Sequence, residues 1–266
     1  MDYLILPCIG LVMGLFGGLL GIGGSIVMIP ALTLTYGENQ HLYQAAAMIC
    51  NFCVAGSSLV GHWRAEAFVK PVLKHLIPSA IIGILAGVAL SNCPCFGGNN
   101  SFWLARLFGA FLVYVAAYNL LRFRPRLPNP SKPPPASKQV QAMLSIGIGL
   151  LTGVGAGLLG IGAGTVSTPL QQLCLKMPLK NAMSNSAAMI VSMAWLGAIY
   201  KNGTLSEHSI AMTQSLRIAA LVLPTGILGG YLGGHLMHAL PRNLVRAVFT
   251  VVCILAAFRL LTVQPA

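Results

Sequence analysis

The chain has 266 residues, of which 56% are hydrophobic and 8% are charged, and its formal net charge is +12. A soluble domain has about 25% charged residues. This chain therefore has too little polar surface for water to surround it, and lipid must be its solvent along much of its length. Its cations are spread between apolar runs instead of forming one basic patch, so composition argues against a nucleic-acid partner.

The apolar residues form eight hydrophobic segments with no alternation of polar and apolar positions, which excludes a lipid-facing β-barrel. A membrane-spanning helix needs about 20 predominantly apolar residues. The first segment starts almost at Met1, and because no cation precedes it and no cleavage site follows it, we expect it to be retained instead of removed as a signal peptide. The sequence predicts an all-α integral membrane protein whose segments are residues 4–36, 43–61, 76–91, 103–121, 140–175, 182–199, 213–236 and 244–262.

Residues 122–138 divide the chain with a segment of six prolines and five cations. Proline on this scale cannot lie in a helix interior, so we expect an extended, charged linker. Short cytoplasmic loops are rich in Lys and Arg, which places the linker in the cytoplasm. The predicted organisation is a first transmembrane repeat at 1–121, the linker at 122–138 and a second transmembrane repeat at 139–266.

The two parts repeat one another. The glycine-rich motif GLLGIGG at 18–24 corresponds to GLLGIGA at 157–163, an offset of 139 residues. Two further sets match in the same order: Gly14 and Pro30 with Gly153 and Pro169, and Pro78, Gly83 and Gly87 with Pro224, Gly229 and Gly233. Internal duplication is common in secondary transporters, which bind their solute between the two repeats.

The glycine motif interrupts the first segment of each repeat. Residues 3–36 as one straight helix would be about 51 Å long at about 1.5 Å per residue, against roughly 30 Å of hydrocarbon. Two interpretations stay open: one crossing followed by an interfacial helix, or a re-entrant hairpin whose glycine tip lies at membrane depth. Charge placement slightly favours the hairpin, which inverts the second repeat relative to the first and puts both termini outside the cytoplasm.

Two GLLGIGxG motifs, each opening one half of a small eight-segment chain, resemble the sulfite exporter TauE/SafE family of membrane transporters. The resemblance implies a multi-pass protein of the bacterial inner membrane that exports small anions, typically sulfite, other sulfur oxyanions or organosulfonates. Residues 181–186 are similar to the family's Ala-x-x-Thr-Ser helix start and place Asn185 and Ser186 at its hydroxyl pair. In the first half the corresponding residues 45–49 have no hydroxyl.

The acidic residues also favour an anion. Asp2, Glu38, Glu66 and Glu207 all lie at segment ends or in loops. Cation carriers and proton pumps place carboxylates inside the membrane, so we expect no metal site and no metal-cation transport. Backbone amides and helix N-termini can bind an anion without any acidic group.

We predict that the anion binds midway through the bilayer, where the two glycine motifs meet. Ser25 and Thr165 are expected to cap the N-termini of the short helices that follow the glycines, and neutral side chains are expected to supply further donors. Helix packing through small residues is the alternative role for the glycines, and interhelical hydrogen bonding is the alternative for the asparagines. The predicted substrate-binding residues are Gly21, Gly23, Gly24, Ser25, Asn51, Gly160, Gly162, Gly164, Thr165, Asn185 and Ser186.

Two basic residues, Arg64 and Lys201, end corresponding segments of the two halves. We expect them to extend to the membrane interface, with attraction of the solute as the alternative. Gly83, Gly87, Gly229 and Gly233 form small-xxx-small pairs, for which we expect helix packing.

The chain has no nucleophile–base–acid arrangement, phosphate-binding loop or HExxH motif, so we expect no enzyme activity and no cofactor. Its seven cysteines leave two other functions open: a membrane thiol-redox protein that uses cysteine pairs such as Cys50 with Cys53, and a membrane assembly partner without transport. Besides the anion and the lipid bilayer, a homodimer partner stays open.

Overall fold

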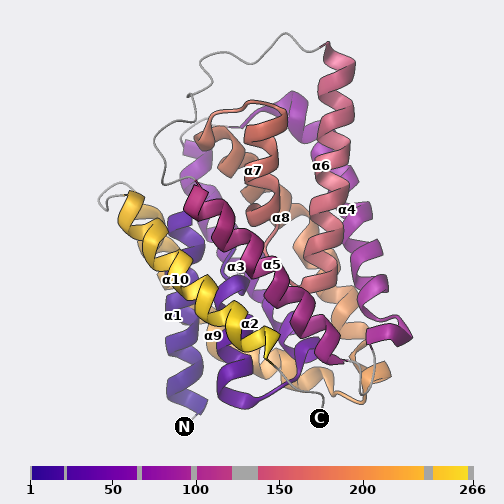
Figure 1. The fold of residues 1–266 in the computed structure, drawn as a ribbon, viewed down its shortest axis with the longest axis vertical. Coiled ribbons are helices and arrows are strands. Elements are labelled where there is room, and N and C mark those ends of the chain that lie inside the picture. Colours follow the sequence, from indigo (N-terminus) through magenta and orange to yellow (C-terminus); the bar gives the residue numbers. More distant parts are fainter. Residues whose placement is uncertain are drawn as a thin grey trace.

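The computed structural model describes residues 2–20, 23–64, 68–96, 101–121, 137–236 and 242–262. This part of the chain contains ten α-helices, two short 3₁₀ helices and no strand, which confirms the predicted all-α fold (Figure 1). Most of the predicted linker lies outside these ranges. The α-helices are α1 (Asp2–Leu20), α2 (Ser25–Tyr36), α3 (Gln40–Arg64), α4 (Lys70–Ser91), α5 (Ser101–Leu121), α6 (Lys138–Leu159), α7 (Gly164–Cys174), α8 (Leu179–Gly203), α9 (Met212–Leu236) and α10 (Arg242–Leu261), and the 3₁₀ helices are η1 (Pro94–Phe96) and η3 (Leu205–His208).

Five helices in the described ranges are long and apolar enough to cross a bilayer: α4, α5, α6, α8 and α9. The apolar stretches of α1, α2 and α10 are shorter. The outward faces of the helices carry large apolar side chains, and Ile82 of α4, Leu151 of α6 and Phe258 of α10 are each more than half exposed. Exposed apolar area of this extent is stable in lipid, and the chain is a multi-pass membrane protein.

Each glycine motif reverses the direction of the chain. A Cβ added at Gly24 would overlap Met13, so the chain that leaves α1 folds back and α2 packs beside α1. In the second half, Gly160 ends α6 in the left-handed conformation, and α7 returns alongside it (Figure 1). Each glycine-interrupted segment thus folds as a hairpin, and the membrane depth of its tip stays a prediction. α1 starts and α10 ends toward one end of the bundle, the end that bears the described termini, and α6 starts at the other end (Figure 1).

Two pairs of helices are in close contact through glycines, α1 with α9 and α4 with α6. A Cβ at Gly14 would overlap the Gly226 carbonyl, and a Cβ at Gly153 would overlap the Ala80 carbonyl. Small residues allow such close backbone approach in membranes, so the packing role predicted for the small-xxx-small glycines is confirmed. The glycines that would clash across these pairs are Gly10, Gly14, Gly229 and Gly233 between α1 and α9, and Gly83, Gly87, Gly149, Gly153 and Gly157 between α4 and α6.

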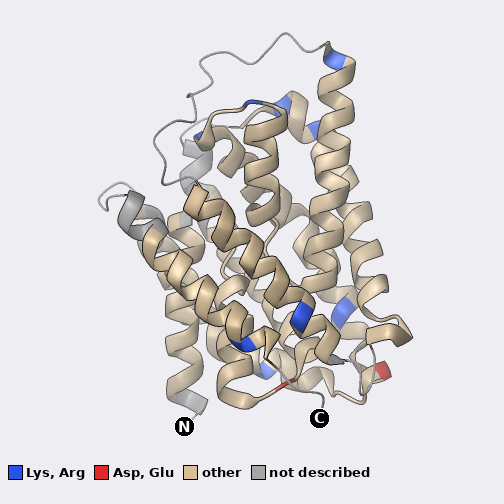
Figure 2. Ribbon diagram, viewed as in Figure 1, with Lys and Arg blue, Asp and Glu red and all other residues tan. Residues whose placement is uncertain are grey.

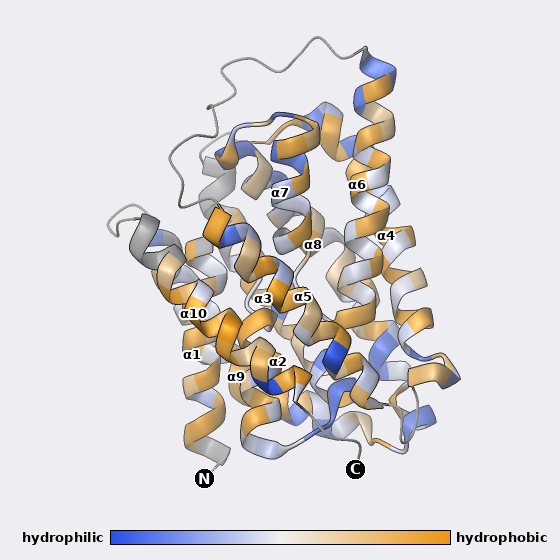
Figure 3. Ribbon diagram, in the orientation of Figure 1, coloured by the Kyte–Doolittle hydropathy of each residue, from blue (hydrophilic) through white to orange (hydrophobic). Residues whose placement is uncertain are grey.

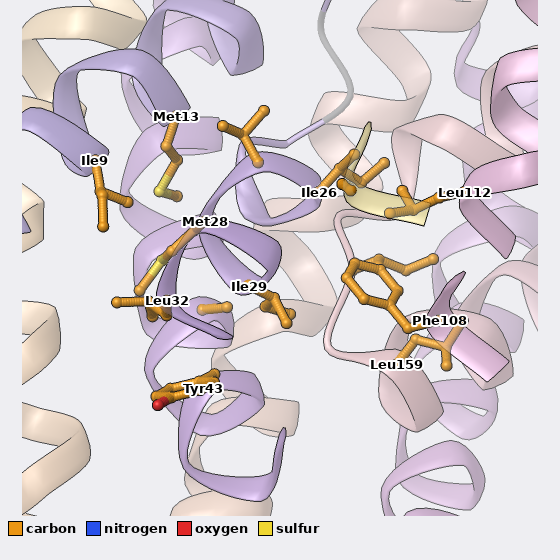
Figure 4. Close-up of a cluster of buried hydrophobic side chains, with 14 of the residues drawn as sticks. Ile9, Met13, Ile26, Met28, Ile29, Leu32, Tyr43, Phe108, Leu112 and Leu159 are labelled. Carbon is orange, nitrogen blue, oxygen red and sulfur yellow. The ribbon is translucent and has the colours of Figure 1, made fainter. Parts of the chain in front are cut away.

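The larger apolar core surrounds α2 and extends to α5 and α10 (Figure 4). Met28, Ile29 and Leu32 of α2 have no exposed surface and pack near Met13 of α1. Figure 3 shows that α7, which follows the second glycine motif, is more polar than α2. The two hairpins therefore have the same path but differ in the chemistry of their short helices.

The described Lys and Arg residues gather toward the two ends of the bundle, and the ribbon in its middle carries none of them (Figure 2). Lys70, Lys74, Lys138, Lys176 and Lys180 belong to the end where α6 begins. The described acidic residues, coloured red, lie at the opposite end, which bears the termini (Figure 2).

Candidate functional site

The tips of the two hairpins touch at the centre of the fold. A Cβ built on Gly23 would lie 2.8 Å from the Cα of Gly162. The backbone N–H of Gly162 donates a hydrogen bond to the Ser25 hydroxyl, with 2.8 Å between nitrogen and oxygen. The predicted meeting of the two glycine motifs is therefore present, and Ser25 is the residue that joins them.

Asn51 of α3 ties both tips together. Its amide nitrogen donates to the Ser25 hydroxyl at 3.0 Å and to the Gly160 carbonyl at 3.4 Å, and its amide oxygen accepts from the Ser25 backbone N–H at 3.3 Å. Ser25 has no exposed surface and Asn51 is 2% exposed. A buried amide with all these groups paired fixes the relative position of two hairpins that are far apart in sequence.

Glycine is required at two positions of the tips because of backbone conformation. Gly23 has φ of 78° and Gly160 has φ of 68°, a region that costs other residues roughly 1–2 kcal/mol. The space beside each is also filled: Asn51 lies 3.2 Å from a Cβ built on Gly23, and Gln44 lies 2.8 Å from one built on Gly160. Backbone conformation and packing therefore both require glycine at positions 23 and 160.

The predicted N-caps are wrong. The N-cap residues are Gly24 before α2 and Ala163 before α7, and neither makes a side-chain cap hydrogen bond. Ser25 lies within the first turn of its helix because its hydroxyl bonds Gly162 and Asn51 across the tip. Thr165 lies within the first turn of α7, where its hydroxyl donates to the Gly162 carbonyl at 3.1 Å.

The absence of side-chain caps leaves donors at the start of α7. Helix geometry gives the first N–H groups no intrahelical acceptor, and no hydrogen bond within the described ranges uses those of Gly164 and Thr165. Both residues are buried. Unpaired N–H groups at the positive end of a helix are suited to an anion.

A second polar cluster lies between α7 and α8, formed by Ser167, Thr168, Gln171, Asn185 and Ser186, all at most 7% exposed. The Gln171 amide nitrogen donates to the hydroxyls of Ser167 and Ser186 at 2.7 Å and 3.1 Å, and its oxygen accepts from Asn185 at 3.1 Å. Thr168 donates to Ser186 at 3.1 Å. Asn185 also accepts from the Val69 backbone N–H at 3.0 Å.

The predicted site residues therefore fall into two groups. Gly23, Ser25, Asn51, Gly160 and Gly162 meet at the tips, with Gly164 and Thr165 at the start of α7. Asn185 and Ser186 belong to the α7–α8 cluster. Gly24 packs against Met13 of α1, and Gly21 lies outside the described residues.

The sequence analysis did not identify Ser167, Thr168 and Gln171 as site residues. A signal was available, because the offset of 139 between the glycine motifs pairs them with Met28, Ile29 and Leu32. All three partners are buried in the apolar core. Polar residues at depth in one repeat that replace apolar residues in the other mark the polar side of the site.

The predicted extension of Lys201 to the membrane interface is wrong. Its side chain has no exposed surface, and its ammonium group lies 2.8 Å from each of three atoms: His41 Nδ1, Ser91 Oγ and Asn92 Oδ1. Three neutral acceptors satisfy its three N–H donors, so the cation can remain inside the bundle. The side chain of its predicted counterpart, Arg64, is outside the described set.

Two histidines complete the group around Lys201. The Nε2 atom of His41 lies 3.0 Å from the Phe96 carbonyl oxygen. The His208 ring stacks on that of His41, with centroids 3.7 Å apart, and its Nε2 atom lies 3.3 Å from Asn92 Oδ1. Burial, followed by the Lys201 charge, lowers the pKa of His208.

Among the described residues, no group of three or more His, Cys, Asp or Glu side chains is arranged to hold a metal ion. The seven cysteines are free thiols in this part of the structure, and Cys50 and Cys253 are buried. The polar chemistry of the bundle interior thus comes from neutral amides and hydroxyls together with the Lys201 group.

Curated relatives share the whole length of this chain. It is 22% identical over 296 residues to the "Probable membrane transporter protein MamO" of Paramagnetospirillum magneticum, covering 98% of this chain and 45% of that protein. It is 25% identical over 282 residues to the "Probable membrane transporter protein YunE" of Bacillus subtilis, covering 98% of both. A "Probable membrane transporter protein" of Xylella fastidiosa is 27% identical over 257 residues, covering 94% of this chain and 89% of that protein.

The chain thus spans less than half the length of MamO and almost all of YunE. No solved structure matches it. The family model for the sulfite exporter TauE/SafE matches residues 6–260, and the chain belongs to this family of membrane transporters.

Proposed function

We propose that this protein is a secondary transporter that exports a small anion, sulfite or another sulfur oxyanion or organosulfonate, bound between two repeats where the hairpin tips meet. The observation that carries the proposal is the pair of buried, unpaired N–H groups of Gly164 and Thr165 beside the tip contact. These N–H groups lie at the N-terminus of α7, which is the positive end of its helix dipole, and no described carboxylate lies near them.

The choice of an anion rests on the charges around the site. The described acidic residues lie at the end of the bundle that bears the termini (Figure 2). A cation at the tips would face N–H donors and no carboxylate within the described ranges. An oxyanion would be stabilised by those donors, and the Thr165 hydroxyl would join them by turning its O–H from the Gly162 carbonyl to the anion. None of these groups has the strong attraction of a buried arginine.

The α7–α8 cluster supports a route from the tips toward the end where α6 begins. Thr165 and Thr168 lie one helical turn apart on α7, and Thr168 contacts Ser186, which contacts Gln171. The corresponding residues of the first half are apolar and buried. We propose that the anion passes along this polar side and not along the apolar one.

The equivalence of the two halves is part of the proposal. The contact of Gly14 with Gly226 in one helix pair and of Gly153 with Ala80 in the other supports it, because the sequence matches Gly14 to Gly153 and an offset of 146, that of Pro78 and Pro224, takes Ala80 to Gly226. Each half would then place its first helix against the fourth helix of the other. A transporter can use such crossed packing to rock one half against the other about a central site.

The test uses purified protein in liposomes loaded with radiolabelled sulfite, sulfate or sulfoacetate, with protein-free liposomes as the blank. We expect saturable efflux of at least one of these anions, and its loss in Gly23→Ala but not in the matched helix variant Gly155→Ala. Replacing all seven cysteines should leave the flux intact, whereas a thiol-redox protein would lose its activity. No saturable flux of any anion would refute the proposal.

A further inference from the structure

Lys201 joins the two halves of the chain at the end of the bundle that bears the termini. It lies in the last turn of α8, and its three partners belong to the first half: His41 in the first turn of α3, Ser91 in the last turn of α4, and Asn92 just after α4. A cation at the C-terminal end of α4 is also favoured by the helix dipole. The contact therefore closes this end of the interface between α3, α4 and α8.

The geometry assigns the protons of this group. An ammonium has three N–H donors and no acceptor, so His41 Nδ1 must offer a lone pair to Lys201. The Nε2 atom of a neutral His41 then carries the ring proton and donates it to the Phe96 carbonyl, 3.0 Å away. These hydrogen bonds and the one from the Ser91 hydroxyl to the Val88 carbonyl, 2.8 Å long, form together only when Lys201 holds its third proton.

Loss of that proton breaks the arrangement. A neutral amine has two N–H donors and one lone pair, so Ser91 must turn its O–H toward Lys201 Nζ and give up its 2.8 Å hydrogen bond to the Val88 carbonyl. Shifting the ring proton of a neutral His41 from Nε2 to Nδ1 does not restore a full set of hydrogen bonds, because Nε2 would then turn a lone pair toward the Phe96 carbonyl oxygen. The contacts between the halves also lose the charge of the ammonium, and hydrogen bonds from a charged donor are roughly twice as strong as neutral ones, so the interface is held less tightly.

The other charges near Lys201 are few. His41 faces it from α3, and Glu207 and His208 act on it electrostatically from η3. α4 contributes only the neutral groups of Ser91 and Asn92. His208 is partly exposed and stacks on His41, so it lies between this buried pair and water.

We propose that Lys201, His41 and His208 form a proton-binding site that holds the α3–α4–α8 interface closed, and that proton release opens this end of the bundle. The inference rests on the proposed anion transport for its purpose, since opening at one end would couple proton movement to passage of the anion. The proton leaves Lys201 Nζ for water, with His208 at the water-facing side of the pair.

The first experiment needs no anion. Hydrogen–deuterium exchange of the peptide covering residues 198–208, corrected for the intrinsic effect of pH, is measured between pH 6 and pH 10. We expect exchange to rise at least tenfold with pH in the wild type. Lys201→Met should exchange fast throughout, whereas Lys180→Arg, at an exposed site, should behave as the wild type.

A gain-of-charge variant separates a proton site from simple packing. Asn92→Asp keeps the side-chain shape and places a carboxylate beside Lys201, which stabilises the ammonium. The midpoint of the exchange transition should move up by about 1–3 pH units. Wild-type exchange that does not depend on pH, or an unmoved midpoint in Asn92→Asp, overturns the proposal.

The link to transport is measured separately in liposomes with an imposed pH gradient. We expect the gradient to change the sulfite flux of the wild type and of His75→Gln, an exposed histidine control, but not that of His41→Gln. A wild type without anion flux refutes the proposed function and leaves the exchange result to decide the proton site. A wild type whose anion flux ignores the pH gradient refutes the coupling.

Discussion

The hydroxyl of Ser25 and the backbone N–H of Gly162 form a 2.8 Å hydrogen bond across 137 residues of sequence. The same oxygen accepts from Asn51 at 3.0 Å. One fully buried oxygen atom is thus the shared acceptor of two donors, one from the second hairpin and one from α3. This oxygen therefore links the two hairpin tips to each other and to α3.

Ser25→Ala should destabilise the protein. The substitution leaves the Gly162 N–H and part of the Asn51 amide buried without an acceptor, which costs about 1–3 kcal/mol. The matched control is Ser192→Ala, because that half-buried hydroxyl donates only to the Ala188 carbonyl of its own helix. Denaturant unfolding in detergent, followed by circular dichroism, gives both values, and equal stability of the two variants would contradict the central role of Ser25.

Gly23→Ala and Gly160→Ala should abolish anion flux while the protein still inserts into membranes. Each change forces a left-handed φ on alanine and pushes a Cβ against Gly162 or Gln44 at 2.8 Å. The tips must then move apart, which separates the donors at the start of α7 from the Ser25–Asn51 contact.

The control for these variants is Gly155→Ala in α6. A Cβ there has nothing within 4 Å, and alanine is favoured over glycine in a helix by roughly 0.5–1 kcal/mol. Flux is measured in liposomes at matched protein content. Normal flux in Gly23→Ala would show that the glycine tip serves packing alone.

The fold was predictable where it depends on local sequence. Glycine motifs that interrupt long apolar runs made a hairpin one of two interpretations, and small residues four apart predicted close helix packing. These features follow from length, hydropathy and the absence of a side chain. The helix starts were less predictable, because Ser25 and Thr165 can bond either a helix end or a distant backbone group, and only the tertiary contact with Gly162 decides.

The interior polar groups were only partly predictable. Asn51 stands out because an amide within an apolar run needs a partner. Lys201 does not, because a lysine at a segment end usually extends to the interface, and its acceptors at His41 and Ser91 are 160 and 110 residues away. Nothing in the local sequence of α8 shows that three neutral acceptors converge there.

The two ends of the bundle should face opposite sides of the membrane, with the linker end in the cytoplasm. Lysines gather where α6 begins, and the described acidic residues lie at the end bearing the termini (Figure 2), an arrangement that agrees with the positive-inside rule. In a cysteine-free background, a cysteine at Ser206 should react with an impermeant maleimide in intact cells. A cysteine at Ser137 should react only after permeabilisation, and the reverse pattern would invert the orientation.

Divalent metal transport should be absent. The described carboxylates lie away from the hairpin tips (Figure 2), and metal carriers need carboxylate or similar ligands at depth. Liposomes loaded with a metal-sensitive dye should show the same Mn²⁺ or Zn²⁺ entry with and without the protein. A saturable, protein-dependent metal flux would overturn the charge argument.

Thr165→Val should weaken anion binding without unfolding the protein. Valine matches threonine in shape, so the buried site at 7% exposure keeps its packing. The change removes the hydroxyl of the residue that carries one of the unpaired N–H groups of α7, a hydroxyl that bonds the Gly162 carbonyl at 3.1 Å. A lost donor costs about 1–3 kcal/mol, which corresponds to a roughly 5- to 150-fold rise in the Kd for sulfite, measured by calorimetry on purified protein.

Thr35→Val is the control, because Thr35 is exposed and donates within its own helix, and its Kd should equal that of the wild type. Equal affinities in all three proteins would place the anion away from the start of α7.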